Sequence, residues 1–359
     1  MTIRAFGAPH RYLQGPGAID ELAALVSLYG QRPLVVIDTA LFGVLRERMQ
    51  AILGSHVSHM EFVEFSGECS ARQIDDVAIR AKATNSDILI AVGGGKAIDT
   101  TKGARIKTGG KLVVLPTVAS NDAPTSRLAI VYTDDHILSE VRMMPTNPDA
   151  VVVDTQIIAQ APRRFFVAGI GDALTKKFEA EQCYRSGGLN FYKAQPAELA
   201  IGIADRCYRV IRRDGIAALA AVDLKKPDAA FESVVEATIL LSGLGFESGG
   251  LSIAHSLTRG FSAVPSLNNA LHGEQVAFGL LVQLCLEQRD ADFLNDMVAF
   301  YEAVGLPTNL NGLGFKGDLQ DGIRTIAQRS IAEAPYLKQF VGEVTEQRLS
   351  AAIERANQF

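Results

Sequence analysis

The sequence predicts an α/β N-terminal domain with a parallel, Rossmann-like sheet, followed by an all-helical C-terminal domain. Over residues 1–160, short apolar runs alternate with helical patterns, which is typical of a parallel sheet covered by helices on both faces. After Pro162, helical periodicity broken by glycine and proline continues without a convincing strand. We therefore expect domains at residues 1–160 and 161–359, with the active site in the cleft between them.

The elements of the first domain are expected in regular order. Each strand is a short β-branched or apolar run bounded by turn residues or by a helical pattern. The expected strands are residues 33–38, 56–65, 87–92, 111–117, 127–132 and 150–154. The expected helices are residues 15–30, a stretch ending near Ile52, residues 70–84 and residues 96–107.

Composition narrows the class of protein. The chain has 359 residues, 48% of them hydrophobic, enough for a large core and about two domains. The net charge of −5 and the absence of a basic block disfavour nucleic-acid binding. Four scattered cysteines predict buried free thiols. Without a signal-like N-terminus or an uninterrupted apolar span, we expect a soluble, cytoplasmic protein that does not contact a membrane.

A glycine-rich turn is the strongest motif of the first domain. In DILIAVGGGKAIDTTKG, a buried strand runs into Gly93–Gly95 and a helix follows at once. Glycines let a ligand approach the backbone, and the N–H groups at a helix N-terminus favour an anion such as pyrophosphate. The turn lacks the GxGxxG spacing, so a tight turn without a ligand remains the alternative.

Asp38 and Asp122 follow two other strands. Asp38 ends its strand, where a carboxylate can accept hydrogen bonds from an adenosine ribose and repel a 2′-phosphate, which favours NAD over NADP. An ordinary aspartate at the end of a strand is the alternative. Asp122 lies in PTVASNDAPTSRLAIVY, a loop of the kind that lines ligand crevices in open sheets, although a plain surface loop is possible.

Three residues of the second domain are candidate metal ligands. In the segment 251–279, His255 and His272 lie on two apolar, helix-compatible runs separated by Gly260, Pro265 and two asparagines. Two such helices could aim both imidazoles at one metal ion, although a pair of hydrogen-bonded core histidines would have the same pattern. In FFVAGIGDALTKKFEAEQC, glycines predict a turn, and Asp172 is expected at the start of a long helix, either as an N-cap or at the cleft.

Four motifs in order resemble the glycerol dehydrogenases, a subgroup of the metal-dependent, iron-containing alcohol dehydrogenase superfamily. The motifs are GGGKAIDTTKGA, PTVASNDAPTS, GIGDALTKKFEA and AHSLTRGF…ALHGEQVAFG, and the resemblance covers nearly the whole chain. It implies a cytoplasmic homo-oligomer that oxidises glycerol and related vicinal diols with NAD at the secondary hydroxyl. The implied product of glycerol is dihydroxyacetone, formed through a zinc-bound alkoxide and hydride transfer.

The same resemblance implies roles for individual residues. The metal ligands would be Asp172, His255 and His272, and the catalytic residues His255 and Asp122, with Asp122 touching the substrate. Asp38 would hold the adenosine ribose, and pyrophosphate would lie against Gly94, Gly95 and Lys96. The nicotinamide side would be read by Asp99, Thr117 and Ser120, and the cofactor would also touch Ser126, Leu128 and Tyr132.

One departure from the superfamily bears on the metal. Iron-type relatives usually place a further histidine one helical turn after the metal-binding aspartate, and Lys176 stands at that position here. One carboxylate and two imidazoles leave an open coordination position, which fits catalytic zinc better than octahedral iron. We therefore expect Zn²⁺, with iron as the alternative.

Other functions remain open. A dehydrogenase of the same superfamily could act on another small alcohol or a hydroxy acid. A dehydroquinate synthase-type enzyme would also use NAD and zinc, but its anionic substrate needs several basic side chains, and the segment 251–279 offers only Arg259. A protein that senses dinucleotide without turnover would have no use for an intact metal triad.

Overall fold

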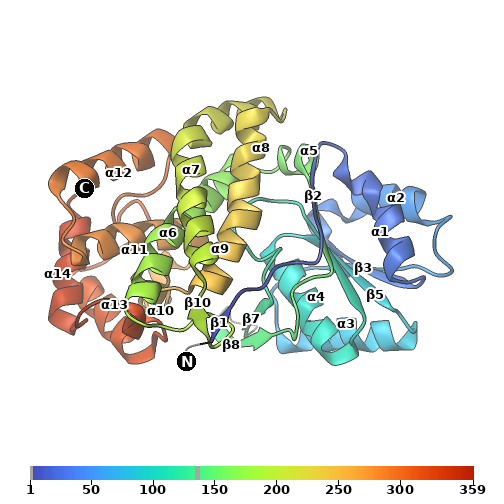
Figure 1. Ribbon diagram of the computed structural model, residues 1–359, viewed down its shortest axis with the longest axis horizontal. Coiled ribbons are helices and arrows are strands. Elements are labelled where there is room, and N and C mark those ends of the chain that lie inside the picture. The colour runs from blue at the N-terminus through green and yellow to red at the C-terminus, as the bar shows by residue number, and fades with distance from the viewer. Residues whose placement is uncertain (1–2, 134–137) are drawn as a thin grey trace. The chain divides into compact units, whose positions relative to one another are not determined.

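The computed structural model describes residues 3–133 and 138–359 (Figure 1). Its contacts divide the chain into two compact units. The α/β unit comprises Gly7–Ala161 and Lys225–Pro227. The helical unit comprises Pro162–Leu224, Asp228–Phe359 and the N-terminal segment that ends at Phe6.

A six-stranded parallel sheet forms the centre of the α/β unit, as predicted. Its strand order is β2-β9-β6-β5-β3-β4. The strands are β2 (Tyr12–Gly15), β3 (Pro33–Asp38), β4 (Glu61–Phe65), β5 (Ile88–Gly93), β6 (Lys111–Pro116) and β9 (Ala150–Asp154). The central strands β3 and β5 are almost wholly buried, which explains why they read as continuous apolar runs.

Helices cover both faces of this sheet (Figure 1). Helices α1 (Leu22–Tyr29) and α2 (Phe42–Leu53) share a core cluster with the sheet side chains of one face, including Val35 and Val92. Helices α3 (Ala71–Ala83) and α4 (Gly95–Thr108) pack together, with α4 against β5 and β6. Short helical turns η1 (Ala18–Glu21), η2 (Thr39–Leu41) and α5 (Thr155–Ile158) complete the unit.

The structure corrects the expected strands at four elements. β7 (Leu128–Tyr132) was expected in the main sheet, but it forms a separate antiparallel pair with β8 (Leu138–Met143). β8 and the edge strand β2 were missed, because their exposed or half-buried residues do not form a continuous apolar run. The strand expected over residues 56–65 begins only at Glu61.

The helical unit is built from long helices that follow one another along the chain. They are α6 (Arg163–Arg185), α7 (Glu198–Leu224), α8 (Ala229–Glu236), α9 (Ser242–Gly249), α10 (Ile253–Phe261), α11 (His272–Leu286), α12 (Ala291–Val304), α13 (Leu319–Glu333) and α14 (Glu346–Ala356). Shorter helical segments are η3 (Ala237–Leu241), η4 (Pro265–Leu267) and η5 (Leu337–Gln339). The unit is not wholly helical, because β10 (Gln195–Pro196) pairs in parallel with β1 (Arg4–Ala5).

α6 is the central helix of this unit. It packs against α7, α9 and α11, and α11 also packs against α10 (Figure 1). Most of its residues from Phe166 to Cys183 are buried, which explains why its sequence shows little polar periodicity. The buried surroundings of α6 are where the candidate metal ligands meet.

One continuous helical stretch of the described residues, Ala229–Gly249, is long and apolar enough to cross a membrane. Its mean hydropathy is 1.4 over an 18-residue window, of which 56% is buried in the unit. Phe231, Val234 and Val235 on this stretch are fully buried. Core helices of globular domains share these properties, so the stretch is weak support for a membrane span.

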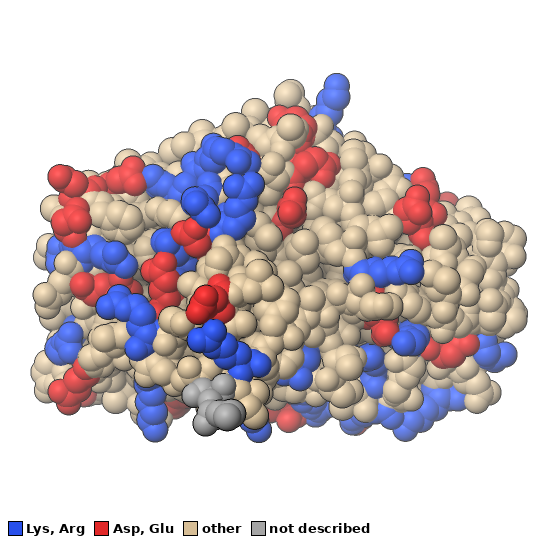
Figure 2. Space-filling model, in the orientation of Figure 1, with Lys and Arg blue, Asp and Glu red and all other residues tan. Residues whose placement is uncertain are grey.

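The burial of the cysteines and the distribution of charged side chains agree with what the composition predicts. Cys69, Cys183, Cys207 and Cys285 are free and buried, as predicted. In Figure 2, Lys and Arg are interspersed with Asp and Glu, and a blue group lies over α7. Arginines of α7 are held in ion pairs, between Arg209 and Asp205, Arg212 and Asp296, and Arg213 and Asp214.

Candidate metal and cofactor sites

Three helices of the helical unit bring Asp172, His255 and His272 together. One potential ligand atom from each residue lies within 4.8 Å of the other two. Asp172 Oδ1 is 3.3 Å from His255 Nε2 and 3.9 Å from His272 Nε2. The two imidazole rings are tilted by 59° with centroids 5.3 Å apart. The expectation that two helices aim both histidines at one point is therefore met by α10 and α11.

Close helix crossings put these side chains next to one another. Gly273, directly after His272, lies so near α6 that a Cβ atom there would collide with the Ala168 carbonyl. A Cβ at Gly279 would lie 2.6 Å from the Ala254 carbonyl, so α10 and α11 also approach closely. These two glycines of the motif ALHGEQVAFG thus set how near His272 comes to Asp172 and His255.

The local structure around Asp172 differs from the expectation. The turn predicted at Gly169 and Gly171 does not form, and Asp172 is not an N-cap, because α6 begins at Arg163 and runs through all three residues. Glycine is tolerated here because α11 packs against it: a Cβ at Gly171 would lie 2.6 Å from the Gly273 carbonyl. Tertiary packing therefore accounts for glycines that locally resemble a turn.

Glu179 orients His255. It lies two helical turns after Asp172 on α6, is fully buried, and accepts hydrogen bonds from the backbone N–H groups of Ser252 and His255. Its other carboxylate oxygen contacts His255 Nδ1. Burial opposes protonation of His255, but the carboxylate favours the proton on Nδ1 and raises the pKa of the ring. In the neutral imidazole the lone pair of Nε2 then faces Asp172, which is the usual arrangement behind a metal-binding histidine.

The charge states of these groups are tightly linked. Desolvation raises the pKa of Asp172, but the Lys176 ammonium and both imidazoles outweigh it and hold that pKa well below its usual range. Desolvation lowers the pKa of His272 to about 4, opposed by Asp172 and reinforced by His255 and Lys176. At neutral pH the site therefore presents an ionised carboxylate and a neutral His272, the forms that bind a metal.

The donor set fits a divalent metal ion. Asp172 is 1% exposed, and its Oδ2 atom has no hydrogen-bond partner among the described residues. An unpaired buried carboxylate oxygen is costly unless a cation satisfies it. One carboxylate and two imidazoles match the ligand types and the number of a catalytic zinc site.

Lys176 enters the same site. Its Nζ donates to Asp172 Oδ1 over 2.6 Å and lies 3.1 Å from His255 Nε2. The side chain is 1% exposed, and its Nζ is 5.3 Å from the centre of the Phe246 ring. Lys176 stands where iron-type relatives usually have a further histidine. It therefore places a positive charge among the three candidate metal ligands.

The glycine turn of the α/β unit has the geometry of an anion site. Gly93 ends β5 with a φ of 157°, and a Cβ there would lie 3.0 Å from Asp38 Cβ. Gly94 is the N-cap of α4, and no side chain of the described residues caps this end of the helix. The N–H groups at the start of α4 therefore remain available for an anion such as pyrophosphate.

Charged side chains flank this turn. Lys96, in the first turn of α4, pairs with the buried Glu68 over 2.9 Å. Asp38 accepts a hydrogen bond from the Ala40 N–H at the carboxyl end of β3. Residues proposed for pyrophosphate directly follow β5, and Asp38, proposed for the ribose, ends the adjacent strand β3, so both lie at the same edge of the sheet.

The loop after β6 lies over the glycine turn. A Cβ at Gly94 would lie in ordinary contact with Val118 at 3.5 Å, and one at Gly95 would lie 3.2 Å from the Asn121 side-chain amide, which is a tight contact. Thr117 donates its N–H to the Gly93 carbonyl. Thr117 and Asp122 are buried, and Ser120 is half-buried. The structure therefore gathers these residues around the start of α4.

Lys102 on α4 holds this loop through hydrogen bonds, a role that the sequence did not predict. Its fully buried Nζ donates to the carbonyl oxygens of Ala123 and Leu128 over 2.6 Å each, to Ser126 Oγ and to Asp99. Asp99 also accepts the Ile130 N–H. Burial, with a smaller contribution from Asp122, raises the pKa of Asp99 above its usual value.

These contacts give several predicted cofactor residues a structural role. Asp99, Ser126 and Leu128 are tied together by Lys102, and the N–H of Tyr132 donates to the Cys69 carbonyl. Whether their side chains also touch a cofactor stays a prediction. The sequence offered one signal for Glu179, its seven-residue spacing from Asp172, whereas Lys102 looked like an ordinary helical lysine.

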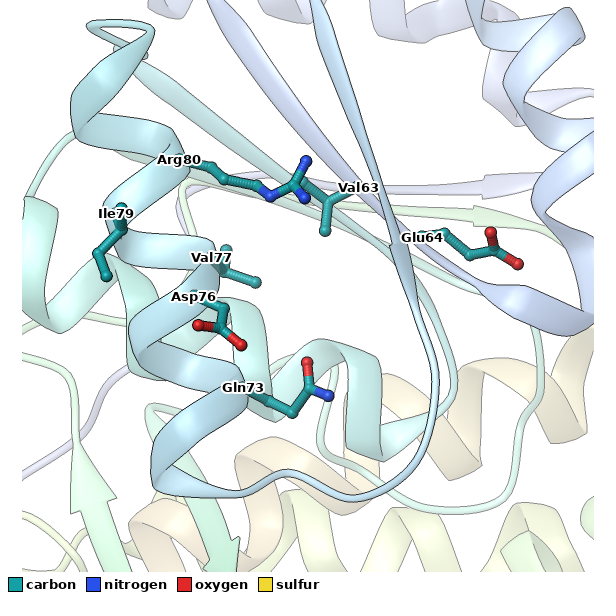
Figure 3. Close-up of a pocket in the computed structure, with 7 residues that line it drawn as sticks. All are labelled: Val63, Glu64, Gln73, Asp76, Val77, Ile79 and Arg80. Atoms are coloured by element: carbon teal, nitrogen blue, oxygen red, sulfur yellow. The ribbon is translucent and has the colours of Figure 1, made fainter.

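A surface depression elsewhere in the α/β unit contains none of these residues. It has a volume of about 400 Å³ and lies between the edge strand β4 and α3 (Figure 3). Its lining residues are Val63, Glu64, Gln73, Asp76, Val77, Ile79 and Arg80. In Figure 3 the Glu64 side chain points away from α3, so its charge is not gathered with that of Asp76. We assign it no function.

A glycine turn in a parallel sheet and an Asp–His–His cluster on packed helices are the parts of a metal-dependent dehydrogenase. Residues 9–155 match the family model described as iron-containing alcohol dehydrogenase. The chain is 36% identical to a glycerol dehydrogenase of Escherichia coli O6:H1, covering 99% of this chain and 97% of that protein. It is 34% identical to a glycolaldehyde reductase of Halobacterium salinarum, with coverage of 98% and 97%.

A solved structure agrees with this similarity. The crystal structure of a probable glycerol dehydrogenase from Sinorhizobium meliloti 1021 superposes with a TM-score of 0.93 at 41% identity, covering 99% of each chain. The chain belongs to the iron-containing alcohol dehydrogenase family. The resemblance to glycerol dehydrogenases expected from the four motifs is confirmed.

Proposed function

We propose that this protein is an NAD-dependent, zinc-dependent alcohol dehydrogenase that oxidises glycerol and related vicinal diols at the secondary hydroxyl. Glycerol then yields dihydroxyacetone. The observation that carries the proposal is the cluster of Asp172, His255 and His272, in a chain similar over its full length to glycerol dehydrogenases. The α/β unit would bind NAD and the helical unit the metal, the roles expected for the domains at residues 1–160 and 161–359.

In the helical unit, Asp172, His255 and His272 would hold the metal. When bound, Zn²⁺ makes a hydroxyl group that it contacts far more acidic, by the effect that lowers the pKa of water from about 15.7 to about 7. Glu179 would hold the His255 ring with Nε2 toward the metal. Asp172 supplies the negative charge, because its carboxyl remains ionised at neutral pH.

In the α/β unit, the chain's own groups would orient NAD. The N–H groups at the start of α4 and the Lys96 ammonium would bind the pyrophosphate, and Asp38 the adenosine ribose. When bound, NAD would supply the acceptor for the hydride of the secondary carbon, and the hydroxyl proton would pass to solvent. No general base is assigned. His255 acts through the metal, and Asp122 would accept a hydrogen bond from a substrate hydroxyl.

A substrate panel tests the proposal. NAD reduction is expected to be faster with glycerol and 1,2-propanediol than with 2-propanol, because neighbouring hydroxyls can both approach a zinc ion that expands to five ligands. Glycolaldehyde reduction, a hydroxy acid and glycerol 1-phosphate belong in the same panel. If glycerol 1-phosphate or the hydroxy acid proved the better substrate, the glycerol assignment would fail, although a dehydrogenase could remain.

Asp122→Ala is expected to raise KM for glycerol and to weaken the discrimination against anionic analogues. The reason is that a carboxylate accepts a hydrogen bond from a hydroxyl group and repels a carboxylate or a phosphate. The check is the ratio of kcat/KM for glycerol to kcat/KM for glycerol 1-phosphate in both proteins. An exposed aspartate on α3, Asp76→Ala, serves as the control and should leave this ratio unchanged. An unchanged ratio in Asp122→Ala would remove Asp122 from substrate recognition.

Asp38→Gly is expected to narrow the preference for NAD over NADP, mainly by improving NADP. The carboxylate repels a 2′-phosphate and accepts ribose hydrogen bonds, an effect on the order of 1–3 kcal/mol. Asp38→Glu keeps the charge and should keep the preference for NAD. Equal kcat/KM values for the two cofactors in the unmutated protein would contradict this role for Asp38.

A further inference from the structure

Lys176 lies among the three candidate metal ligands, but the proposed reaction gives it no role. The Lys176 ammonium lies 2.6 Å from Asp172 Oδ1 and 3.1 Å from His255 Nε2. These two atoms face each other over 3.3 Å within the candidate metal site. With 1% of its side chain exposed, it is held inside the site and is not shared with solvent. The adjacent Lys177 pairs instead with Glu181 and Asp205.

His255 can serve only one cation at a time. Its Nδ1 contacts the Glu179 carboxylate, so Nε2 is the ring nitrogen that faces Lys176 and Asp172. Nε2 of a neutral imidazole offers a single lone pair, which can accept a hydrogen bond from Lys176 or bind a metal at about 2.0–2.1 Å. Asp172 has a second, unpartnered oxygen, so it could meet both cations, but His255 could not.

Electrostatic repulsion also opposes a metal ion and the Lys176 ammonium occupying the site together. Asp172 Oδ1 and His255 Nε2 are 3.3 Å apart, so a metal bonded to both would lie next to an ammonium hydrogen-bonded to both. Two cations at such a distance in a buried site repel strongly, because solvent screens them little. Lys176 must therefore leave His255 before a metal takes its place.

We propose that Lys176 is a built-in competitor of the metal: its ammonium occupies the cation position between Asp172 and His255, and metal binding has to displace it. The affinity of the site for Zn²⁺ is then lower than the three ligands alone would give. The same ammonium neutralises Asp172 when metal is withheld, so the fold depends little on the metal. This inference rests on the metal site of the proposed function.

The test is the Zn²⁺ dissociation constant, measured by competition with a chromophoric chelator on the full chain. Lys176→Met keeps the length of the side chain without its charge, and should bind Zn²⁺ about tenfold more tightly or better, because the displaced charge and its repulsion are gone. Lys177→Met removes a neighbouring positive charge outside the site and should bind as the unmutated protein does. Lys176→Gln replaces Lys176→Met if the latter does not fold.

Thermal unfolding gives a second readout. In chelator, Lys176→Met should melt below the unmutated protein, because Asp172 is left buried without a cation. With added Zn²⁺ its Tm should rise by more than that of the unmutated protein, since tighter binding adds more stability at a fixed metal concentration. Lys177→Met is the control for the zinc-dependent rise, which should equal that of the unmutated protein. Its Tm in chelator is not compared, because this variant leaves Glu181 and Asp205 unpaired.

The outcomes separate this inference from the proposed function. Equal or weaker Zn²⁺ binding by the folded Lys176 variant, beside an unmutated protein that binds one zinc, would overturn the competition while leaving the zinc enzyme intact. Zinc binding by the variant alone would support the competition and contradict a zinc-dependent natural enzyme. Absence of zinc binding from both proteins would overturn both.

Discussion

His272→Ala is expected to lose its bound metal, because two protein ligands cannot hold a catalytic zinc. The value of kcat/KM for glycerol should then fall by about a thousandfold or more. The fold should survive. His272 is the first residue of α11, and 46% of its side chain is exposed, so truncation leaves no cavity in the core. The measurements are zinc per chain by elemental analysis, kcat/KM for glycerol, and the circular dichroism spectrum.

The matched control is His59→Ala, which removes an exposed histidine of the α/β unit. It should retain the zinc content and activity of the unmutated protein. If His272→Ala kept full zinc content and full activity, His272 would not be a ligand, and the three-ligand site would be wrong.

Glu179→Gln is expected to weaken Zn²⁺ binding or kcat/KM by about 10- to 100-fold, as loss of a carboxylate behind a metal-binding histidine usually does. Glutamine has nearly the same shape, but it removes the charge that fixes the proton on His255 Nδ1. The His255 ring can then turn or protonate on Nε2, the atom needed for the metal. Zinc affinity and kcat/KM for glycerol are both measured.

Glu181→Gln is the control for this prediction. Glu181 lies on the same helix, half-buried, and pairs with Lys177 outside the metal site. It should bind zinc as the unmutated protein does. Wild-type zinc affinity in Glu179→Gln would mean that Glu179 only fills space beneath α10.

The buried parallel strands were the most predictable part of the fold. PLVVID forms β3 with the expected limits, Pro33–Asp38, and residues 150–154 form β9. Strands covered on both faces read as continuous apolar runs, so local sequence suffices to find them. β2 was missed because an edge strand with half-buried residues, such as YLQG, carries no such run.

Helix limits that depend on tertiary packing were harder to predict. Gly169 and Gly171 resemble a turn in the sequence, yet both lie inside α6, where α11 approaches the backbone too closely for a larger side chain. A single sequence cannot reveal such an approach, because the partner residue, Gly273, lies about a hundred positions away.

The candidate metal site also has a part that the sequence predicts and a part that depends on tertiary packing. The pattern of 251–279 and the motif around Asp172 predicted which side chains could meet, and the structure brings them together. The spacing of Lys176 and Glu179 from Asp172 was visible in the sequence, but their contacts with His255 were not predictable. Glu179 and Lys176 act on His255 across 76 and 79 positions in the chain, and only the crossing of α6 and α10 makes these contacts. The metal role of the cluster and the cofactor residues remain predictions.

The most direct measurement is NAD reduction with glycerol before chelation, after chelation, and after adding back Zn²⁺, with bound metal determined at each step. If the enzyme depends on zinc, its activity should be lost when the metal is removed and should return when Zn²⁺ is added. Return of activity with iron alone would replace zinc by iron at the same ligands. Full activity in protein from which all metal has been removed would contradict the account, because Asp172, His255 and His272 would then have no metal to hold.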